Sequence, residues 1–272
     1  AIISYDLNSK SKIKFSYSKR VQRTTTFKMN PFPEREHSET LEQGDPNLLP
    51  EFIDNIEIGY DNNLSEKFSF FSNFFFRKTN NLINRVNTVY NDSILNRIYS
   101  NVGNSTIYGL ELGLQFKPIK KWSNYFGGNI FYQDINGEFD NLPVETNALV
   151  YSFNFNSTFK FNSSSSIQFG LNYLSKRITA QGEDSRFYLP SLTVKKSFLD
   201  NSLVMSLQWL NMDMGLINSN EQRITTSREN SFFTTTNYVY EVDVFLLNVS
   251  YNFNRKKSNA NFIKSEFGER EF

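Results

Sequence analysis

The sequence predicts an all-β protein, a transmembrane antiparallel up-and-down β-barrel to which this chain contributes about 11 of about 22 strands. Three observations support this prediction. Apolar and polar residues alternate with a period of two along many segments. The connections between these segments are alternately short and long. Aromatic residues make up 16% of the chain, yet no stretch approaches the roughly 20 apolar residues that a membrane helix needs.

The clearest element is a long hairpin between Asn101 and Gln133, with a tight turn at residues 117–121. In its first arm one face is apolar and the other is polar: Tyr108, Leu110, Leu112, Leu114 and Phe116 oppose Gly109, Glu111, Gly113, Gln115 and Lys117. The second arm carries Trp122, Phe126, Ile130 and Tyr132 on one face. Both arms are long enough to cross a bilayer as tilted strands.

The remaining strands follow the same alternation. In chain order we expect them at residues 1–7, 12–22, 52–61, 68–77, 149–161, 167–173, 187–198 and 203–209, with a last strand that ends at Phe253. Asp54 interrupts one apolar face, and Pro190 weakens the strand that contains it. We expect long irregular connections at residues 23–50, 78–103 and 214–240, and loops at 136–146 and around 181–184.

The alternation of short and long connections distinguishes a membrane barrel from a soluble β-sandwich. Outer-membrane barrels have short periplasmic turns and longer extracellular loops, and their apolar faces contact lipid. A soluble sandwich would have shorter strands, and its long loops would not fall so regularly on one end. The strand directions then place the short turns and the C-terminus in the periplasm. We therefore expect residues 1–253 to form the barrel portion and residues 254–272 to form a charged periplasmic tail.

An open sheet of eleven strands would leave two edges with unpaired backbone groups in hydrocarbon, where each group costs several kcal/mol. We therefore expect an N-terminal barrel half outside this chain to complete the barrel. The sequence starts at Ala1 without a recognisable export signal, and we interpret it as a fragment.

Composition excludes several functional classes. The formal net charge is +1 and basic residues are interspersed with acids, so we predict no nucleic-acid partner. Cysteine is absent, which excludes disulfides and thiolate chemistry. The sequence has no Ser/His/Asp grouping, phosphate-binding glycine loop or H-E-x-x-H motif, and we predict no enzyme activity and no cofactor.

Metal ligands are also not predicted. His37, the single histidine, lies between Glu36 and Glu39 in a polar segment and is expected to be solvated. The acidic pairs Glu138/Asp140 and Glu183/Asp184 lack the ligand spacing of a calcium loop, so exposed loop charge is the better interpretation.

Two groups of residues are candidates for contact with a substrate. Charged residues on polar strand faces would project into the lumen: Lys14, Arg20, Glu57, Arg77 and Glu111. Loops mounted on a rigid scaffold often carry binding residues, and our ligand-binding candidates lie in or near the predicted external loops: Tyr188, Arg223, Arg228, Phe232, Phe233 and Tyr238.

Several motifs resemble those of TonB-dependent outer-membrane receptors, in particular the carboxy-terminal half of the barrels common in the Bacteroidetes group. Residues 44–51 (GDPNLLPE) are similar to the G-N-P-x-L-x-P-E signature that precedes a barrel strand. Residues 19–23 (KRVQR) and 29–32 (MNPF) resemble the elements just upstream, although Thr24 stands where the family has proline. Residues 101–111 are similar to the N-x-G-x-S-x-x-Y-G-x-E motif.

The resemblance implies a receptor that binds a substrate at extracellular loops and imports it through a plugged barrel. Its partners would be outer-membrane lipid, a plug domain, the TonB complex and, in some members, a surface lipoprotein. The plug and the TonB box have no counterpart in this sequence, so energy coupling rests on resemblance alone. The main alternative is a structural or interaction barrel without transport, and a soluble adhesive β-sandwich is a third possibility. A plug and TonB box upstream of Ala1 would favour the receptor.

Overall fold

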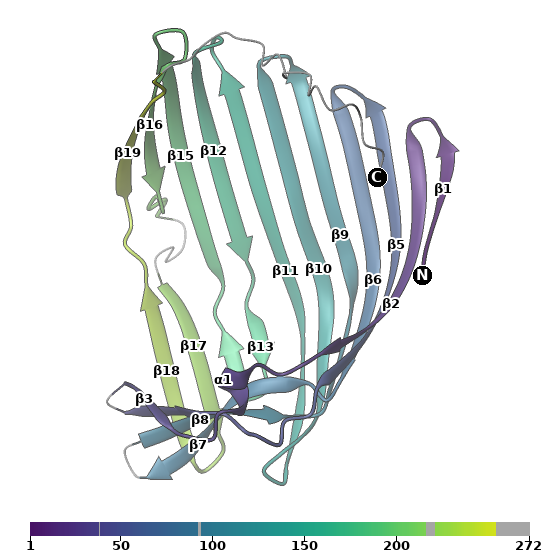
Figure 1. Ribbon diagram of the computed structural model, residues 1–272, viewed down its shortest axis with the longest axis vertical. Coiled ribbons are helices and arrows are strands. Elements are labelled where there is room, and N and C mark those ends of the chain that lie inside the picture. Colours follow the sequence, from purple (N-terminus) through teal and green to yellow (C-terminus); the bar gives the residue numbers. More distant parts are fainter. Residues whose placement is uncertain (38, 92–93, 216–220, 254–272) are drawn as a thin grey trace, which may run out of the picture.

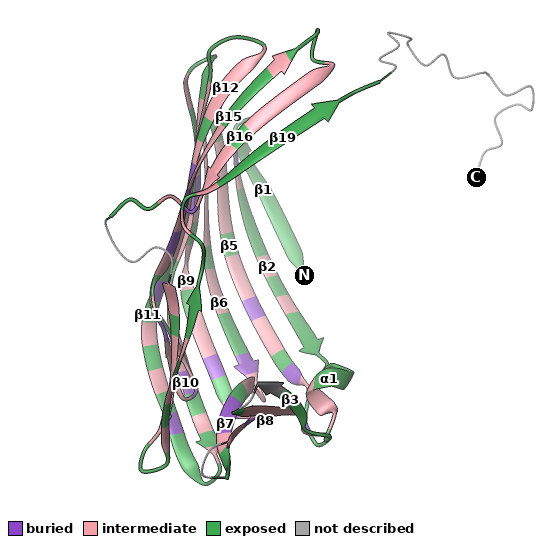
Figure 2. Cartoon of the chain, turned by 90° about the vertical axis from the view of Figure 1, so that its left-hand side faces the viewer, coloured by how far each residue is buried: buried purple, intermediate pink, exposed green. Residues whose placement is uncertain are grey.

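The computed structural model describes residues 1–37, 39–91, 94–215 and 221–253, so the predicted tail at 254–272 lies outside the described residues. Its main element is an 11-stranded sheet that curves like a trough (Figures 1 and 2). All neighbouring strands in this sheet are antiparallel. The strands, in sheet order, are β1 (Ile2–Asn8), β2 (Ser11–Gln22), β5 (Glu51–Ser65), β6 (Phe68–Asn80), β9 (Asn104–Ile119), β10 (Trp122–Phe139), β11 (Leu142–Lys160), β12 (Ser165–Leu174), β15 (Phe187–Phe198), β16 (Leu203–Leu210) and β19 (Val244–Tyr251).

The eleven predicted strands are therefore confirmed, and so are the five short turns that join them pairwise. These turns lie together at one end of the sheet, and the long connections lie at the other end (Figure 1). We call the two ends the short-turn end and the long-loop end. No helix within the described ranges is long and apolar enough to cross a membrane.

The long connections are not irregular, which corrects the prediction from sequence. They form two additional four-stranded sheets at the long-loop end, to which the predicted loop around 181–184 also contributes two strands, and they include the short helix α1 (Thr26–Met29). One sheet, which we call the cap sheet, contains β3 (Glu34–His37), β4 (Thr40–Gln43), β8 (Ile94–Asn101) and β7 (Ile83–Asn91). The other, which we call the side sheet, contains β13 (Arg177–Thr179), β14 (Gly182–Asp184), β17 (Glu221–Arg228) and β18 (Phe232–Val239).

The predicted loop at residues 136–146 is also wrong. β10 and β11 continue through it in unbroken register as far as the pair Phe139 and Leu142. Asp140 and Asn141 connect the strands with φ angles of 54° and 59°. Two successive residues with positive φ match the twist of a tight hairpin, and Asp and Asn tolerate that conformation better than most residues. The polar composition of this segment thus reflects solvent exposure of a hairpin and not the absence of strands.

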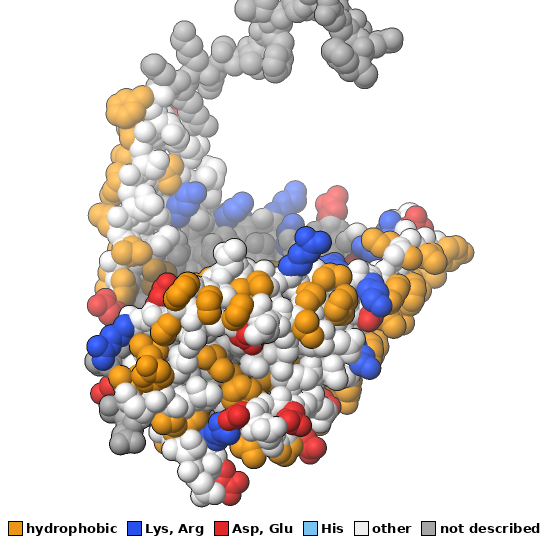
Figure 3. Space-filling model, turned by 60° about the horizontal axis from the view of Figure 1, so that its bottom comes forward, with side chains coloured by type: hydrophobic (Ala, Val, Ile, Leu, Met, Phe, Trp, Pro, Cys, Tyr) orange, Lys and Arg blue, Asp and Glu red, His pale blue; other side chains and the backbone are white. Residues whose placement is uncertain are grey.

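One face of the main sheet is mainly apolar. A single row of paired residues crosses six strands, from Phe15 through Ile58, Phe74, Leu110 and Ile130 to Tyr151. Ile58 is 49% exposed and Phe74 45%, so the described residues leave this part of the face uncovered. Hydrophobic side chains gather on the outside of the curved sheet when it is viewed from the long-loop end (Figure 3). This is the face that lipid contacts in an outer-membrane barrel.

The opposite face is concave and mainly polar. At the long-loop end it carries a small core in which Val86 of β7 packs against Ile135 of β10 and Val144 of β11. Ile135 and Val144 belong to the face opposite to the apolar row, because their positions in the strands differ from it by an odd number of residues. This packing places the cap sheet on the concave side, where Figure 2 shows β7 and β8.

Close backbone approach anchors the cap sheet to the long hairpin of β10 and β11. Gly103 adopts a φ of 119°, and an added Cβ there would collide with the carbonyl oxygen of Asn136. At Gly137 an added Cβ would collide with the carbonyl oxygen of Val102, which is fully buried. Both positions thus require glycine, for conformation at Gly103 and for space at Gly137.

Candidate functional site

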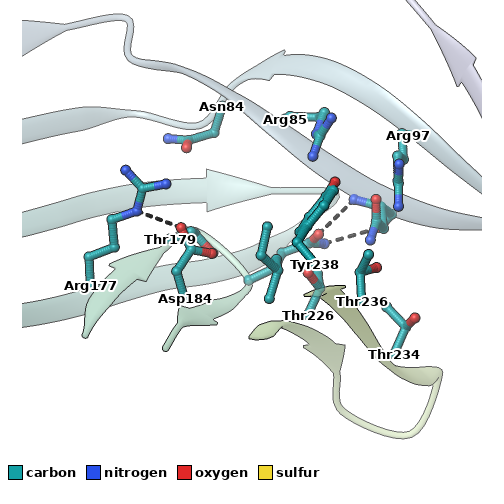
Figure 4. A pocket seen from close by; sticks show the side chains of 13 residues that line it. Asn84, Arg85, Arg97, Arg177, Thr179, Asp184, Thr226, Thr234, Thr236 and Tyr238 are labelled. Carbon is teal, nitrogen blue, oxygen red and sulfur yellow. Dashed lines mark hydrogen bonds and ion pairs between the residues drawn. The ribbon is translucent and has the colours of Figure 1, made fainter. Parts of the chain in front are cut away.

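A cavity of about 230 Å³ opens between the cap sheet and the side sheet at the long-loop end (Figure 4). Its lining combines three guanidinium groups, one carboxylate and several hydroxyl and amide groups. The lining residues are Asn84, Arg85, Asn87, Arg97, Arg177, Thr179, Gln181, Asp184, Ile224, Thr226, Thr234, Thr236 and Tyr238. Every strand that contributes to the cavity lies in a segment that the sequence did not predict to be a strand.

Strand periodicity explains how each sheet presents these side chains. In the cap sheet Asn87 of β7 pairs with Arg97 of β8, whereas the neighbouring Val86 points into the core. In the side sheet Thr226 pairs with Thr234, and the next lining pair is Ile224 with Thr236. Because alternate residues of a strand share a face, the lining positions of β17 and β18 are all even-numbered.

Gln181 joins the two small sheets. Its side-chain oxygen accepts a hydrogen bond of 2.6 Å from the backbone N–H of Asn87, and its side-chain nitrogen donates one of 3.1 Å to the Asn87 carbonyl. The Gln181 side chain thereby takes the place of a neighbouring strand's backbone for Asn87, which is 94 positions away in sequence. This pair of hydrogen bonds fixes the relative position of the two walls of the cavity.

Among the described residues that line the cavity, guanidinium groups outnumber carboxylates. Arg177 donates to the Asp184 carboxylate across 2.5 Å, and the Asp184 side chain is only 5% exposed. Asp184 is the one acidic group among the described residues that line the cavity, and it is neutralised by this pair. Arg85 and Arg97 add two further positive charges to the lining. The arrangement can therefore bind anionic and hydroxyl-bearing groups.

The structure brings only one of the six predicted ligand-binding residues, Tyr238, into this cavity. Arg223 pairs with Glu221 at 3.4 Å, and Arg228 pairs with Asp140 at the tip of the β10–β11 hairpin at 2.7 Å. Phe232 and Phe233 lie at the start of β18, outside the cavity lining, and Phe233 is 74% exposed. Tyr188 lies in β15 and is buried, with 5% of its surface exposed.

Sequence reasoning missed the cavity arginines Arg85, Arg97 and Arg177, because it assigned their segments to loops. Within 221–239 the available signal was composition, because threonine, phenylalanine, tyrosine and valine favour strands. No pattern within one segment, however, predicts that two small sheets pack against each other.

The five predicted lumen-facing residues all lie on the concave face, but they do not form one site. The Glu57 carboxylate accepts hydrogen bonds from Ser16 at 3.2 Å and from Asn55 at 2.7 Å, and Arg77 donates to Asn55 at 3.4 Å. Lys14 pairs with Asp61. The remaining two residues, Arg20 and Glu111, lie elsewhere on this face, opposite Ile53 and Asn73 respectively.

The acidic pairs considered as metal ligands have other partners. Asp140 pairs with Arg228, and Glu183 pairs with Lys176. Within the described ranges no group of three or more His, Asp or Glu side chains could hold a metal ion. The side chain of His37 lies outside the described part of the structure.

A curved antiparallel sheet with an apolar outer face, a polar inner face, short turns at one end and folded loops at the other defines the class of outer-membrane β-barrels. Comparison with family models agrees. Residues 1–251 match the outer membrane protein beta-barrel family, and the chain belongs to that family. A search of curated proteins finds no sequence that matches this chain.

The fold is also similar to solved barrels of TonB-dependent receptor type. The siderophore receptor PirA from Pseudomonas aeruginosa is 14% identical with a TM-score of 0.58, over 88% of this chain and 41% of that protein. The FrpB iron transporter from Neisseria meningitidis is 12% identical with a TM-score of 0.54, over 91% and 37%. The copper transporter OprC is 14% identical with a TM-score of 0.57, over 77% and 32%. This chain therefore corresponds to a partial portion of such barrels.

Proposed function

We propose that the chain is part of a TonB-dependent receptor that binds a substrate at its extracellular loops and imports it through a plugged barrel. The observation that carries the proposal is the polar cavity between the cap and side sheets, at the long-loop end and over the concave face. A substrate bound there would lie at the outer mouth of the lumen. The fold of siderophore, iron and copper transporters supports the same proposal.

The proposed orientation follows from the loops. The short-turn end and the C-terminus lie in the periplasm, and the long-loop end faces the exterior. The other barrel half, the plug and contact with the TonB complex would come from parts of the protein outside this chain, since the chain spans only about a third to two fifths of the matched receptors. The chain itself is proposed to have no catalytic role.

The alternative is a barrel that serves as an interaction subunit without transport. One observation favours it: β18 exposes Phe233 by 74% and Val239 by 70% at the long-loop end. Exposed apolar side chains outside the lipid-facing band are typical of contact with another protein. A surface lipoprotein is the partner that we propose for β18 in either case.

Import can be tested before the substrate is identified. Cells that carry the intact protein are incubated in a mixed nutrient extract, and the compounds that disappear from the medium are identified by mass spectrometry. The expected result is selective depletion of one class of compound, abolished by an uncoupler that collapses the proton-motive force. Depletion that persists with the uncoupler, or no selective depletion, would contradict the proposed function.

A pair of neighbouring substitutions tests the role of the cavity. Thr236→Trp would fill part of the cavity and should abolish the selective depletion, because Thr236 lines it. Thr235→Trp is the matched control, since Thr235 is exposed on the opposite face of β18. Equal uptake by the two variants would show that the cavity is not the binding site.

A further inference from the structure

The two basic amino acids are distributed unequally between the ends of the molecule. The five hairpin ends at the short-turn end, residues 5–15, 60–71, 113–125, 157–168 and 193–206, contain ten lysines, four acidic residues and no arginine. All twelve arginines of the chain lie outside these segments. An overall net charge of +1 therefore conceals a strongly basic short-turn end.

Several of these lysines belong to the concave face. Lys160 pairs in register with Ser166, which pairs with Lys195, and Lys14 pairs with Gly59. Lys160 and Lys195 line a hollow of about 440 Å³ together with Ser164, Ser166 and Ser197. Among the described residues that line this hollow there is no acidic side chain.

Two of the acidic side chains at this end already form ion pairs with lysines. Lys12 pairs with Asp6 at 3.2 Å, and Lys14 pairs with Asp61. In the part of the chain that the structure describes, Lys160 and Lys195 form no ion pair with an acidic side chain. Their positive charge is therefore available to a molecule that reaches the inner end of the concave face.

The same chemistry occurs at both ends of this face. At the long-loop end, Arg85 and Arg97 accompany threonine hydroxyls in the cavity between the cap and side sheets. At the short-turn end, Lys160 and Lys195 accompany serine hydroxyls. Guanidinium and ammonium groups beside hydroxyl donors suit carboxylate and phosphate oxygens, and positive charge gathered at each end of this face attracts ligands of the opposite sign.

We infer that the imported substrate is an anionic, oxygen-rich molecule that carries carboxylate or phosphate groups, held first by the arginine cavity and then attracted along the concave face by its inner lysines. This inference rests on the proposed function for the direction of movement. The binding chemistry itself does not depend on transport.

Equilibrium binding to the purified intact protein in detergent tests the substrate class. The probes are citrate for carboxylates, tripolyphosphate for phosphates and sucrose as an uncharged control, measured by titration calorimetry at low salt. We expect at least one of the two anions to bind, with affinity that falls as salt is raised, and sucrose not to bind. The preferred anion identifies the group that is recognised.

Variants locate the binding. R85Q/R97Q should weaken anion binding about tenfold or more, because hydrogen bonds from charged donors are the strong ones. The matched control is K19Q/K78Q, which removes the same charge at the same end from the outer face, where both lysines lie opposite Asp54, and should change affinity less than about twofold. Sucrose binding as strong as anion binding, or equal loss in both variants, would overturn the inference.

Uptake separates this inference from the proposed function. If the anion binds through Arg85 and Arg97 but cells do not take it up in an energy-dependent way, the import proposal fails and the substrate class stands. If cells import only uncharged or cationic compounds, the substrate class fails while import stands. In uptake of an anion, K160Q/K195Q should slow import severalfold without changing affinity at the arginine cavity; an unchanged rate would contradict the role of the inner lysines.

Discussion

At the scale of single residues, the two faces of β9 should differ sharply in their tolerance of charge. Leu112 lies on the apolar outer face, paired with Ser72 and Gly128, whereas Gln115 lies on the concave face. Leu112→Arg should destabilise the folded protein by about 2–4 kcal/mol, since a guanidinium near the bilayer midplane loses hydration. Gln115→Arg should cost far less, because a polar interior hydrates it.

Reversible unfolding of the intact protein in lipid vesicles, followed by tryptophan fluorescence in urea, measures this difference. The two variants carry the same new charge three positions apart, so each is the control for the other. Equal losses of unfolding free energy would contradict the lipid-facing assignment of the Leu112 face.

Residue patterns predicted the faces of strands well and the cavity poorly. The face of the sheet on which Lys14, Glu57 and Glu111 lie follows from period-2 alternation within each strand, which is a local property. The association of Arg85 with Arg177 depends on the packing of two sheets that are far apart in sequence, and no local pattern encodes it. Tyr238 was predicted because exposed loops often carry binding residues, a general tendency that did not distinguish it from Phe233.

At the scale of elements, the contact between the small sheets depends on the side chain of Gln181. Gln181→Ala would leave the N–H and C=O of Asn87 without these partners, and Asn87 is only 7% exposed. Leaving buried polar groups unpaired costs about 1–3 kcal/mol, and here the cost falls on the cap sheet alone. We expect local loosening of β7 while the main sheet is unaffected.

Hydrogen–deuterium exchange with mass spectrometry resolves this effect by segment. Peptides that contain residues 84–91 should exchange about tenfold faster in Gln181→Ala, and peptides from β9 and β10 should not change. Gln168→Ala, which removes a glutamine from β12 in the main sheet, should leave residues 84–91 unchanged. Unaltered exchange at 84–91 in Gln181→Ala would show that other contacts hold the two sheets together.

Element prediction succeeded where one face of a strand must be apolar and failed where neither face contacts lipid. The eleven strands of the main sheet alternate strongly because one side is the outer apolar face. β7, β8, β17 and β18 mix polar and apolar residues on both faces, so their composition resembles that of loops. Parallel pairing of β4 with β8 brings together segments more than 50 residues apart, which sequence periodicity does not reveal.

At the scale of the whole molecule, the main sheet has two free edges. β1 and β19 each have one neighbour, and every residue of β1 is exposed. Ile2 is 80% exposed and Leu247 65% exposed, as expected for edge strands that have one strand partner each among the described residues. The strand count predicted this open sheet, because single-chain bacterial barrels have even numbers of strands.

Closure by the remainder of the barrel predicts that both edges are paired in the intact protein. Each unpaired backbone group in hydrocarbon costs several kcal/mol, so a membrane-inserted sheet with two open edges would be unstable. In the intact protein in vesicles, backbone amides of β1 and β19 should exchange with deuterium as slowly as those of the central strand β9. In a protein that consists of residues 1–272 alone, the backbone amides of β1 and β19 should instead exchange quickly. This protein should also aggregate when detergent is removed. Fast exchange of β1 and β19 in the intact protein, beside slow exchange of β9, would contradict closure and favour an open sheet that another chain completes.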